Sequence, residues 1–248
     1  MKQYNPQEYW EKRLSDHFSL TGVGHKGFNE RYNEYLYRSR VESLEYLLNK
    51  YGIQIQGKNV LDIGCGTGFW VDYFHQREAN SICGVDITKI SIAHLKNQYP
   101  QYSFYQMNIG EENIPGEHKF DIVTSFDVFH HILDDLQFQL GIRNMSKSLR
   151  NDGYAFISDR FVQMRTPFVK HCKYRGLDEY RKELQKNNLQ IKDVIPVFFL
   201  LDDAFVPITG TIVLRLFPSL LFKLDQRLKK AKLSNGNGLK LLLAYKVD

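Results

Sequence analysis

The chain has 248 residues, of which 43% are hydrophobic and 25% are charged, so it can bury the core of one large domain and is not a disordered chain. The formal net charge is +5, but the basic residues are spread along the chain and do not form the dense stripe of a protein that binds duplex nucleic acid. A nucleic-acid partner is therefore disfavoured, although the basic balance permits an anionic one.

Three cysteines, Cys65, Cys83 and Cys172, are too few and too widely spaced for a disulfide framework or a cysteine-based metal site. We therefore expect no metal and a reducing, cytoplasmic location. The N-terminal segment lacks the apolar stretch of a signal peptide. We expect no transmembrane segment, because no uncharged apolar run approaches the roughly 18 residues that a spanning helix needs.

Residues 1–57 are predicted to form an N-terminal helical cap on a domain of residues 58–248. Apolar residues recur in the cap at near-helical spacing, and Gly52 provides a helix stop. The recurring positions are Tyr32, Leu36, Val41, Leu44, Leu47 and Leu48. Most of the many aromatic residues in this segment are expected to pack the cap onto the domain.

From Asn59 onward, expected strands alternate with expected helices, which predicts parallel pairing and a sheet buried on both faces. The expected strands are 59–63, 82–86, 102–107, 120–126, 154–159, 191–198 and 240–246. The expected helices are 69–76, 88–98, 134–149 and 178–188, and the helix 134–149 is expected to stop near the turn 151–153.

Residues 199–236 form an insertion between the last two expected strands. Apolar residues recur along one helical stripe of the insertion, and basic residues recur every four positions on another face. Pro218 is expected to break this helix or to begin a second one. We rank a helix packed on its own domain first, with 211–233 stably packed, a lid or subunit contact second, and contact with an anionic membrane through residues 211–233 third.

The strongest signal is the run VLDIGCGTG from Val60 to Gly68, in which a strand enters a glycine-rich turn before a helix. Such a turn lets a ligand approach the backbone at a strand's carboxyl end and a helix N-terminus. Its Gly-x-Gly-x-Gly spacing differs from that of dinucleotide sites, and Asp62 before it suits a positively charged ligand better than a pyrophosphate. Asp86 ends the next strand, where a carboxylate can accept hydrogen bonds from ribose hydroxyls.

These residues resemble the class I S-adenosylmethionine-dependent methyltransferases. VLDIGCGTG is similar to their first motif, GVDIT to the strand that ends in the ribose-binding acid, and FDIVTSFDVFHHILDD and LRNDGYAFISD to two later segments. The resemblance covers about residues 55–198. It implies a Rossmann-like α/β fold of seven mostly parallel strands, the last one antiparallel beside the fifth, and an enzyme that transfers a methyl group from S-adenosyl-L-methionine.

The resemblance also assigns residues to the cofactor. It implies that Gly64, Gly66 and Gly68 wrap the methionine and ribose parts, that Asp62 holds the methionine ammonium and that Asp86 holds the ribose.

The adenine side of the implied site departs from the family pattern at one position. Ile87 is expected to pack on adenine. Asn108 stands where family members usually carry an acid for the adenine amino group, and its amide oxygen can accept the same hydrogen bond. The remaining positions assigned to the cofactor site are Cys65, Ile109 and Ser125.

The segment after the fourth expected strand argues against two classes of methyl acceptor. Residues 125–128 lack the Asn/Asp-Pro-Pro-aromatic motif of enzymes that methylate exocyclic amines of bases or glutamine. None of the cysteines is positioned as the nucleophile that methylation at C5 of pyrimidines requires, and Cys172 lacks a Pro-Cys motif.

His130 and His131 follow in the same segment, at the sheet edge where ligands bind. Because an unperturbed imidazole titrates near neutrality, His131 is the candidate general base, with His130 beside it. The alternative is that one or both histidines only hydrogen-bond the loop or pack against the cofactor. Asp127 and Asp159 are the fallback bases.

We expect the acceptor pocket to lie between the cap, the loop 161–176 and the insertion. The aromatic residues expected to line it are Phe161, Phe168, Tyr174, Phe198, Phe199, Phe205 and Phe217. Positive charge on the loop would attract an acidic group of the acceptor, or would only form a solvated basic surface. These charged residues are Arg160, Arg165, Lys170, Lys173 and Arg175.

The sequence thus favours an O-methyltransferase that acts on a small molecule of secondary metabolism or on a sugar of a glycan. The alternative is an RNA methyltransferase, which only the basic pI favours. The affinity of such an enzyme for RNA would fall steeply with salt. A third hypothesis is a cofactor-binding scaffold without catalysis, which a turnover assay would separate. The sequence leaves the oligomeric state open.

Overall fold

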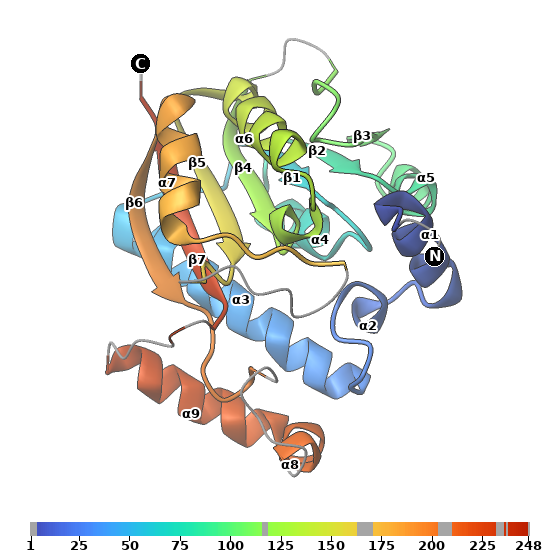
Figure 1. The fold of residues 1–248 in the computed structure, drawn as a ribbon, viewed down its shortest axis with the longest axis vertical. Helices are drawn as coiled ribbons and strands as arrows, with labels where there is room; N and C mark the ends of the chain where they lie inside the picture. Colours follow the sequence, from blue (N-terminus) through green and yellow to red (C-terminus); the bar gives the residue numbers. More distant parts are fainter. Residues whose placement is uncertain are drawn as a thin grey trace.

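A computed structural model describes residues 4–115, 119–162, 171–202, 210–231, 236 and 238–247. It contains a seven-stranded sheet in the order β3-β2-β1-β4-β5-β7-β6 (Figure 1). The strands are β1 (Asn59–Ile63), β2 (Ser81–Asp86), β3 (Ser103–Gln106), β4 (Phe120–Phe126), β5 (Leu149–Asp159), β6 (Leu189–Pro196) and β7 (Lys240–Lys246). The α-helices are α1 (Pro6–Asp16), α2 (Leu20–Val23), α3 (Glu30–Tyr51), α4 (Phe69–His75), α5 (Lys89–Gln98), α6 (Asp135–Ser148), α7 (Leu177–Lys186), α8 (Gly210–Leu216) and α9 (Pro218–Lys230).

The sheet has the predicted topology. Strands β1 to β5 pair in parallel, and β7 lies antiparallel between β5 and β6. The Rossmann-like methyltransferase fold with an antiparallel last strand is therefore confirmed. Several boundaries differ from those expected by one or two residues. The largest difference is at β5: α6 ends at Ser148, and the expected turn at residues 151–153 lies inside β5, where Asp152 adopts a φ of 62°. The register against β4 shifts at this point, so the irregularity is a bulge within the strand.

Successive residues of each strand pack on opposite faces of the sheet, which explains the continuous apolar runs in the sequence. In β1, Val60 packs with α3, α4 and α5, whereas Leu61 packs with α6 and α7. In β4, Ile122 packs on the same face as Val60, and Val123 packs on the same face as Leu61. Helices therefore cover both faces of the sheet (Figure 1).

The long helix α3 belongs to the main core. Asn29 caps its N-terminus by accepting a hydrogen bond from the amide of Tyr32, and Gly52 ends it in the left-handed conformation with a φ of 64°, as the sequence indicated. Leu44 and Leu47 on its inner face are completely buried. The division of the chain at residue 57 stays a prediction.

The insertion forms two helices separated at Pro218, which begins α9 as expected. The inner face of α9 is packed, with Phe222 and Asp225 buried. Stable packing of residues 211–233 stays a prediction, and residues 232 and 233 lie outside the described residues. The outer side of α8 and the start of α9 are exposed. Phe217, expected in the acceptor pocket, is 51% exposed on the surface because Pro218 starts a new helix and turns α9 away there. Within the described ranges, no helix has the length and apolarity to cross a membrane.

Asp225 fastens α9 to the chain that follows β6. Its carboxylate accepts hydrogen bonds from the amides of Phe199, Leu200 and Leu201 at 3.1, 2.7 and 3.2 Å. Burial raises the pKa of this carboxyl, and the three amides oppose that effect.

We predict that Asp225→Ala lowers the free energy of unfolding by about 2–3 kcal/mol, because three amides lose a charged acceptor at once. Denaturant unfolding followed by circular dichroism is the measurement. Asp225→Asn keeps one acceptor oxygen and should lose less. An alanine variant as stable as the wild type would show that water replaces the carboxylate without loss.

Candidate active site

A cavity of about 690 Å³ lies at the carboxyl ends of β1, β2 and β4, between the sheet and the helices α1 to α3. Seven residues assigned to the cofactor from the sequence lie in its wall. They are Gly64, Cys65, Gly66, Asp86, Ile87, Asn108 and Ile109. Asp62, Gly68 and Ser125 lie just outside the wall, and the side chains of Asp62 and Ser125 are buried.

The glycine turn has a backbone that only glycine adopts easily. Gly64 and Gly66 have φ values of 77° and 50°. A Cβ on Gly64 would lie 2.3 Å from the Cγ2 of Val128, so a side chain there would push into the loop after β4. These two positions therefore hold open a part of the cavity where a ligand can reach the backbone.

The two predicted acids sit in different surroundings. Asp62 accepts a hydrogen bond from the Thr124 hydroxyl at 2.8 Å, its other oxygen is buried without a partner among the described residues, and burial raises its pKa to about 7. Asp86 accepts from the amide of Gly66 at 2.9 Å and from the amide and hydroxyl of Thr88 at 2.8 and 2.7 Å. Asp86 thus also holds the glycine turn in place, a role that the sequence did not indicate.

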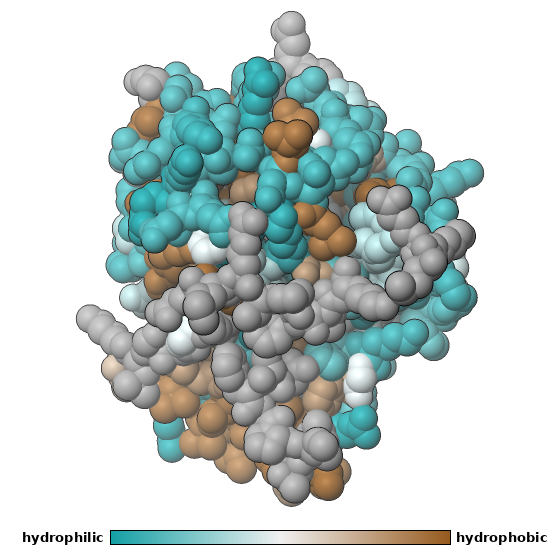
Figure 2. Space-filling view, viewed as in Figure 1, coloured by the Kyte–Doolittle hydropathy of each residue, from teal (hydrophilic) through white to brown (hydrophobic). Residues whose placement is uncertain are grey.

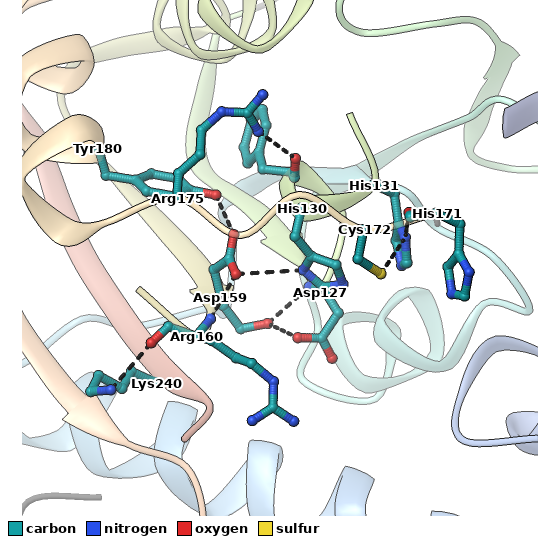
Figure 3. Close-up of polar contacts among 12 residues, drawn as sticks. Asp127, His130, His131, Asp159, Arg160, His171, Cys172, Arg175, Tyr180 and Lys240 are labelled. Atoms are coloured by element: carbon teal, nitrogen blue, oxygen red, sulfur yellow. Dashed lines mark hydrogen bonds and ion pairs between the residues drawn. The ribbon is translucent and has the colours of Figure 1, made fainter. Parts of the chain in front are cut away.

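The histidine pair lies on a short 3₁₀ turn, Phe129–His131, opposite the glycine loop (Figure 3). The Nδ1 of His131 lies 3.0 Å from the carbonyl oxygen of His171. A carbonyl only accepts, so Nδ1 carries the proton of the neutral ring and Nε2 keeps its lone pair. Burial lowers the pKa of His131 to about 4, so the near-neutral titration expected from the sequence is wrong and the ring is uncharged at neutral pH.

His130 points away from this position, toward the strand β5. It is 7% exposed, and its Nδ1 lies 3.6 Å from the Oδ1 of Asp159. Burial holds the pKa of His130 well below its usual range and raises that of Asp159 to about 7. Asp159 also accepts a hydrogen bond from the Tyr180 hydroxyl and is not part of the cavity wall (Figure 3).

The other fallback base, Asp127, does line the cavity but is already engaged. It forms an ion pair with Arg40 of α3, with Nε at 2.8 Å, and accepts from the Ser158 hydroxyl at 2.7 Å. Arg40 was not singled out from the sequence. The sequence indicates Arg40 only by its position on the inner face of α3.

Arg175, expected to add positive charge to the acceptor pocket, is instead a structural residue. It is 1% exposed, donates to the carbonyl oxygen of Ile132 at 3.0 Å and pairs with Asp135 at 2.9 Å. Its guanidinium also lies 4.1 Å from the centroid of the Phe138 ring. Arg175 therefore holds the histidine turn from behind, because several carbonyl oxygens of that turn converge on one site.

The remaining loop and insertion residues divide between the wall and other places. Arg160, Tyr174 and Phe198 line the cavity, whereas Phe161, Lys173 and Phe199 do not. Arg160 is paired with Asp202, and Lys173 with Asp135, at 2.8 Å in both cases. The positions that lie outside the described residues are Arg165, Phe168, Lys170 and Phe205.

Helix α1 supplies wall residues from the cap, which was expected to border the acceptor pocket, although the sequence singled out neither Trp10 nor Arg13 as a wall residue. The Trp10 ring meets the His131 ring edge to face at 4.9 Å between centroids. Arg13 lies over Trp10 and donates hydrogen bonds to the carbonyl oxygens of Thr21 and Gly24 and to the Tyr9 hydroxyl. The signal was their spacing of three positions on one helix face.

Three side chains in the wall offer soft metal-ligand atoms. The ligand atoms of His130, His131 and Cys172 lie within 4.8 Å of one another. The Nδ1 of His131, however, already faces the carbonyl oxygen of His171 and lies 3.5 Å from the Cys172 sulfur. While that bond is made, this nitrogen has no lone pair for a metal ion.

The fold and the glycine-lined cavity define a Rossmann-like methyltransferase. Residues 30–194, more than half of the chain, match the family model of a methyltransferase domain. The chain therefore belongs to this methyltransferase family, within the class I superfamily whose cofactor is S-adenosyl-L-methionine.

Two relatives and one solved structure are similar to this chain. The chain is 25% identical over 162 residues to the "Probable S-adenosylmethionine-dependent methyltransferase" of Mycolicibacterium smegmatis, covering 62% of this chain and 60% of that protein. It is 27% identical over 167 residues to the ubiquinone biosynthesis O-methyltransferase of Pseudomonas aeruginosa, covering 57% and 68%. The N-methyltransferase NodS of Bradyrhizobium japonicum, in complex with S-adenosyl-L-homocysteine, shares the fold over 99% of this chain and 100% of that chain, with a TM-score of 0.64 and 13% identity. The methylated atom thus differs among similar proteins.

The depressed pKa of His131 predicts a pH dependence of stability. The unfolded chain protonates this histidine near its ordinary pKa of 6.5, whereas the folded protein does so only near 4. The contribution of His131 is therefore complete above pH 6.5 and is lost as the pH falls toward 4, at up to about 1.4 kcal/mol per pH unit.

The variant His131→Asn, whose amide can still reach the carbonyl oxygen of His171, should lose less stability than the wild type between about pH 7 and pH 5. Denaturant unfolding at the two pH values measures the difference. His17→Asn removes an exposed imidazole and is the matched control. Equal losses in the wild type and in His131→Asn would contradict the prediction.

Proposed function

We propose that this chain is an S-adenosylmethionine-dependent methyltransferase that methylates an oxygen of a small molecule. The observation that carries the proposal is the cavity, in whose walls the glycine turn and the neutral ring of His131 occur together. Its volume, about 690 Å³, is in the range of small-molecule sites, and aromatic side chains supply much of its lining.

The residues present fit the cofactor. The positive φ values of Gly64 and Gly66 keep Cβ atoms out of the cradle, and the unpartnered oxygen of Asp62 is a buried acceptor close to it. We assign the ribose to Asp86, whose oxygens retain accepting capacity beside the bonds from Gly66 and Thr88. Asn108 fits less directly, since its side-chain oxygen already accepts from the amide of Gly110 at 3.0 Å.

Arg13 adds a positive charge that the sequence argument overlooked. Its hydrogen-bond partners in the described part of the chain are neutral oxygens, and one of them is the carbonyl oxygen of Gly24. The residue before Gly24, Val23, packs against Gly66, so Arg13 lies near the glycine turn. A carboxylate of the cofactor or of the acceptor would be stabilised at this point.

When bound, the cofactor supplies a methyl group on a sulfonium, and the acceptor displaces it in line. The protein's part is to orient the acceptor, exclude water and take up the proton. We assign the proton to the Nε2 of His131, with Trp10 packed on the ring and His171 fixing its tautomer. Because a base whose pKa is near 4 is weak, the acceptor must itself be acidic, and we favour a phenol over the less acidic sugar hydroxyl that the sequence left open.

An RNA acceptor has less support. Two of the cavity arginines are neutralised by Asp127 and Asp202, so they offer no free charge to a phosphate backbone. The aromatic lining of the cavity also favours a small molecule over a polymer.

We predict that Asp86→Ala weakens binding of S-adenosyl-L-homocysteine at least tenfold. Hydrogen bonds to a charged group contribute roughly 1.5–3 kcal/mol, and a decade of affinity corresponds to roughly 1.4 kcal/mol. Isothermal calorimetry on protein that melts like the wild type is the measurement. Asp86→Asn keeps one acceptor oxygen, so its affinity should lie between those of the wild type and Asp86→Ala. Undiminished affinity in the alanine variant would remove Asp86 from the site.

We predict that His131→Asn lowers kcat by roughly 10²–10⁴ with a phenolic acceptor and leaves cofactor affinity unchanged. Asparagine can keep the bond to the carbonyl oxygen of His171 but has no nitrogen at the place of Nε2. Turnover is measured with a panel of phenols of graded pKa, and the loss should shrink as the phenol becomes more acidic. A uniform small loss across the panel would mean that alignment alone carries the reaction.

A further inference from the structure

The corner between α8 and α9 presents large apolar side chains to solvent. Five of the nine large hydrophobic residues that are exposed in the described chain lie here, each between 44% and 60% exposed. We call this group the apolar corner: Ile212, Val213, Leu216, Phe217 and Leu220. Figure 2 shows hydrophobic surface gathered over α8 and α9. A contiguous patch of this kind marks an interaction surface, because its exposure to water is unfavourable.

Basic side chains continue the same outer face along α9. Lys223, Arg227 and Lys230 are exposed, and their spacing of three to four positions places them on one side of the helix in line with Leu220. We call these three residues the basic stripe. Asp225, the acidic residue of the segment 210–231, is buried on the opposite side. The outer face therefore combines apolar side chains at one end with positive charge at the other.

The two helices are held in this orientation by contacts with the cap. The guanidinium of Arg215 donates to the carbonyl oxygen of Gly27 at 2.8 Å and lies 5.7 Å from the centroid of the Phe28 ring. On α9, Phe222 packs against Tyr35 of α3, with ring centroids 5.5 Å apart. The apolar corner therefore faces outward because the inner sides of both helices are already occupied.

We propose that the apolar corner and the basic stripe dock this protein on an anionic lipid bilayer. The two helices would lie in the plane of the interface, with the apolar corner among the headgroups and acyl chains and the basic stripe on lipid phosphates. In a symmetric contact the same segment of a second copy would face this segment, and the described residues 210–231 expose no acidic side chain to pair with the basic stripe. Gly27, which Arg215 contacts, also lines the cavity, so docking brings that wall toward the lipid surface.

The experiment is sedimentation of the full chain with vesicles of phosphatidylcholine, alone or with about 30% phosphatidylglycerol. We expect binding to the anionic vesicles that is at least about tenfold tighter than to the neutral ones and weaker at about 0.5 M salt. The triple variant L216S/F217S/L220S should lose at least about tenfold in affinity. K223Q/R227Q/K230Q should lose the preference for anionic lipid.

L136S/L140S is the matched control, since it removes exposed leucines from α6, and it should bind like the wild type. Circular dichroism confirms that each variant is folded. Absence of vesicle binding, or equal loss in the control, would overturn the proposal. So would a wild-type dimer that L216S/F217S/L220S converts to monomer without any vesicle binding, because the corner would then be a self-contact. Vesicle binding is measured without cofactor or acceptor, so its outcome is independent of the proposed function.

Discussion

The bonds that join the end of β1 to the end of β2 set the geometry on which the site depends. The amides of Gly64 and Cys65 both donate to the carbonyl oxygen of Val85, at 2.7 and 3.1 Å, and the amide of Gly66 donates to the carboxylate of Asp86. These bonds bend the chain sharply where two parallel strands end together. Because Gly64 and Gly66 lack a Cβ, the bend leaves open space at the carboxyl end of β1, beside a helix N-terminus.

The opposite wall depends on burial. Arg175 supports the turn Phe129–His131 by donating to the carbonyl oxygens of Phe129 and of Ile132, the residue that follows the turn. Removing water from these rings disfavours their charged forms and keeps both neutral. The same burial raises the pKa of Asp159. Burial by segments that are distant in the sequence therefore sets the protonation of this wall at neutral pH.

The cap borders the cavity, and the chain that follows β6 contributes Leu201 to its wall. Helix α3 carries Arg40 toward the cavity and Tyr35 toward α9, so one helix supports both the site and the surface outside it. The insertion uses its inner side for packing, through Phe222 and Asp225. Its outer side is free for contacts that the fold does not need, which is how an insertion adds a surface without disturbing the sheet.

The sequence by itself determined the elements and the cofactor loop, because these depend on local patterns. The strands β1, β4 and β7 begin and end where the apolar runs do, and the glycine spacing with Asp86 identified the family. Tertiary structure decided what depends on distance between remote segments. Arg175, expected as a cation in the acceptor pocket, is buried and supports the histidine turn, and Phe217, expected in the same pocket, lies on the surface. The pKa of His131 followed the same rule, because the residues that bury it, Trp10 and His171, come from distant parts of the chain, and desolvation by such neighbours is not encoded in local sequence.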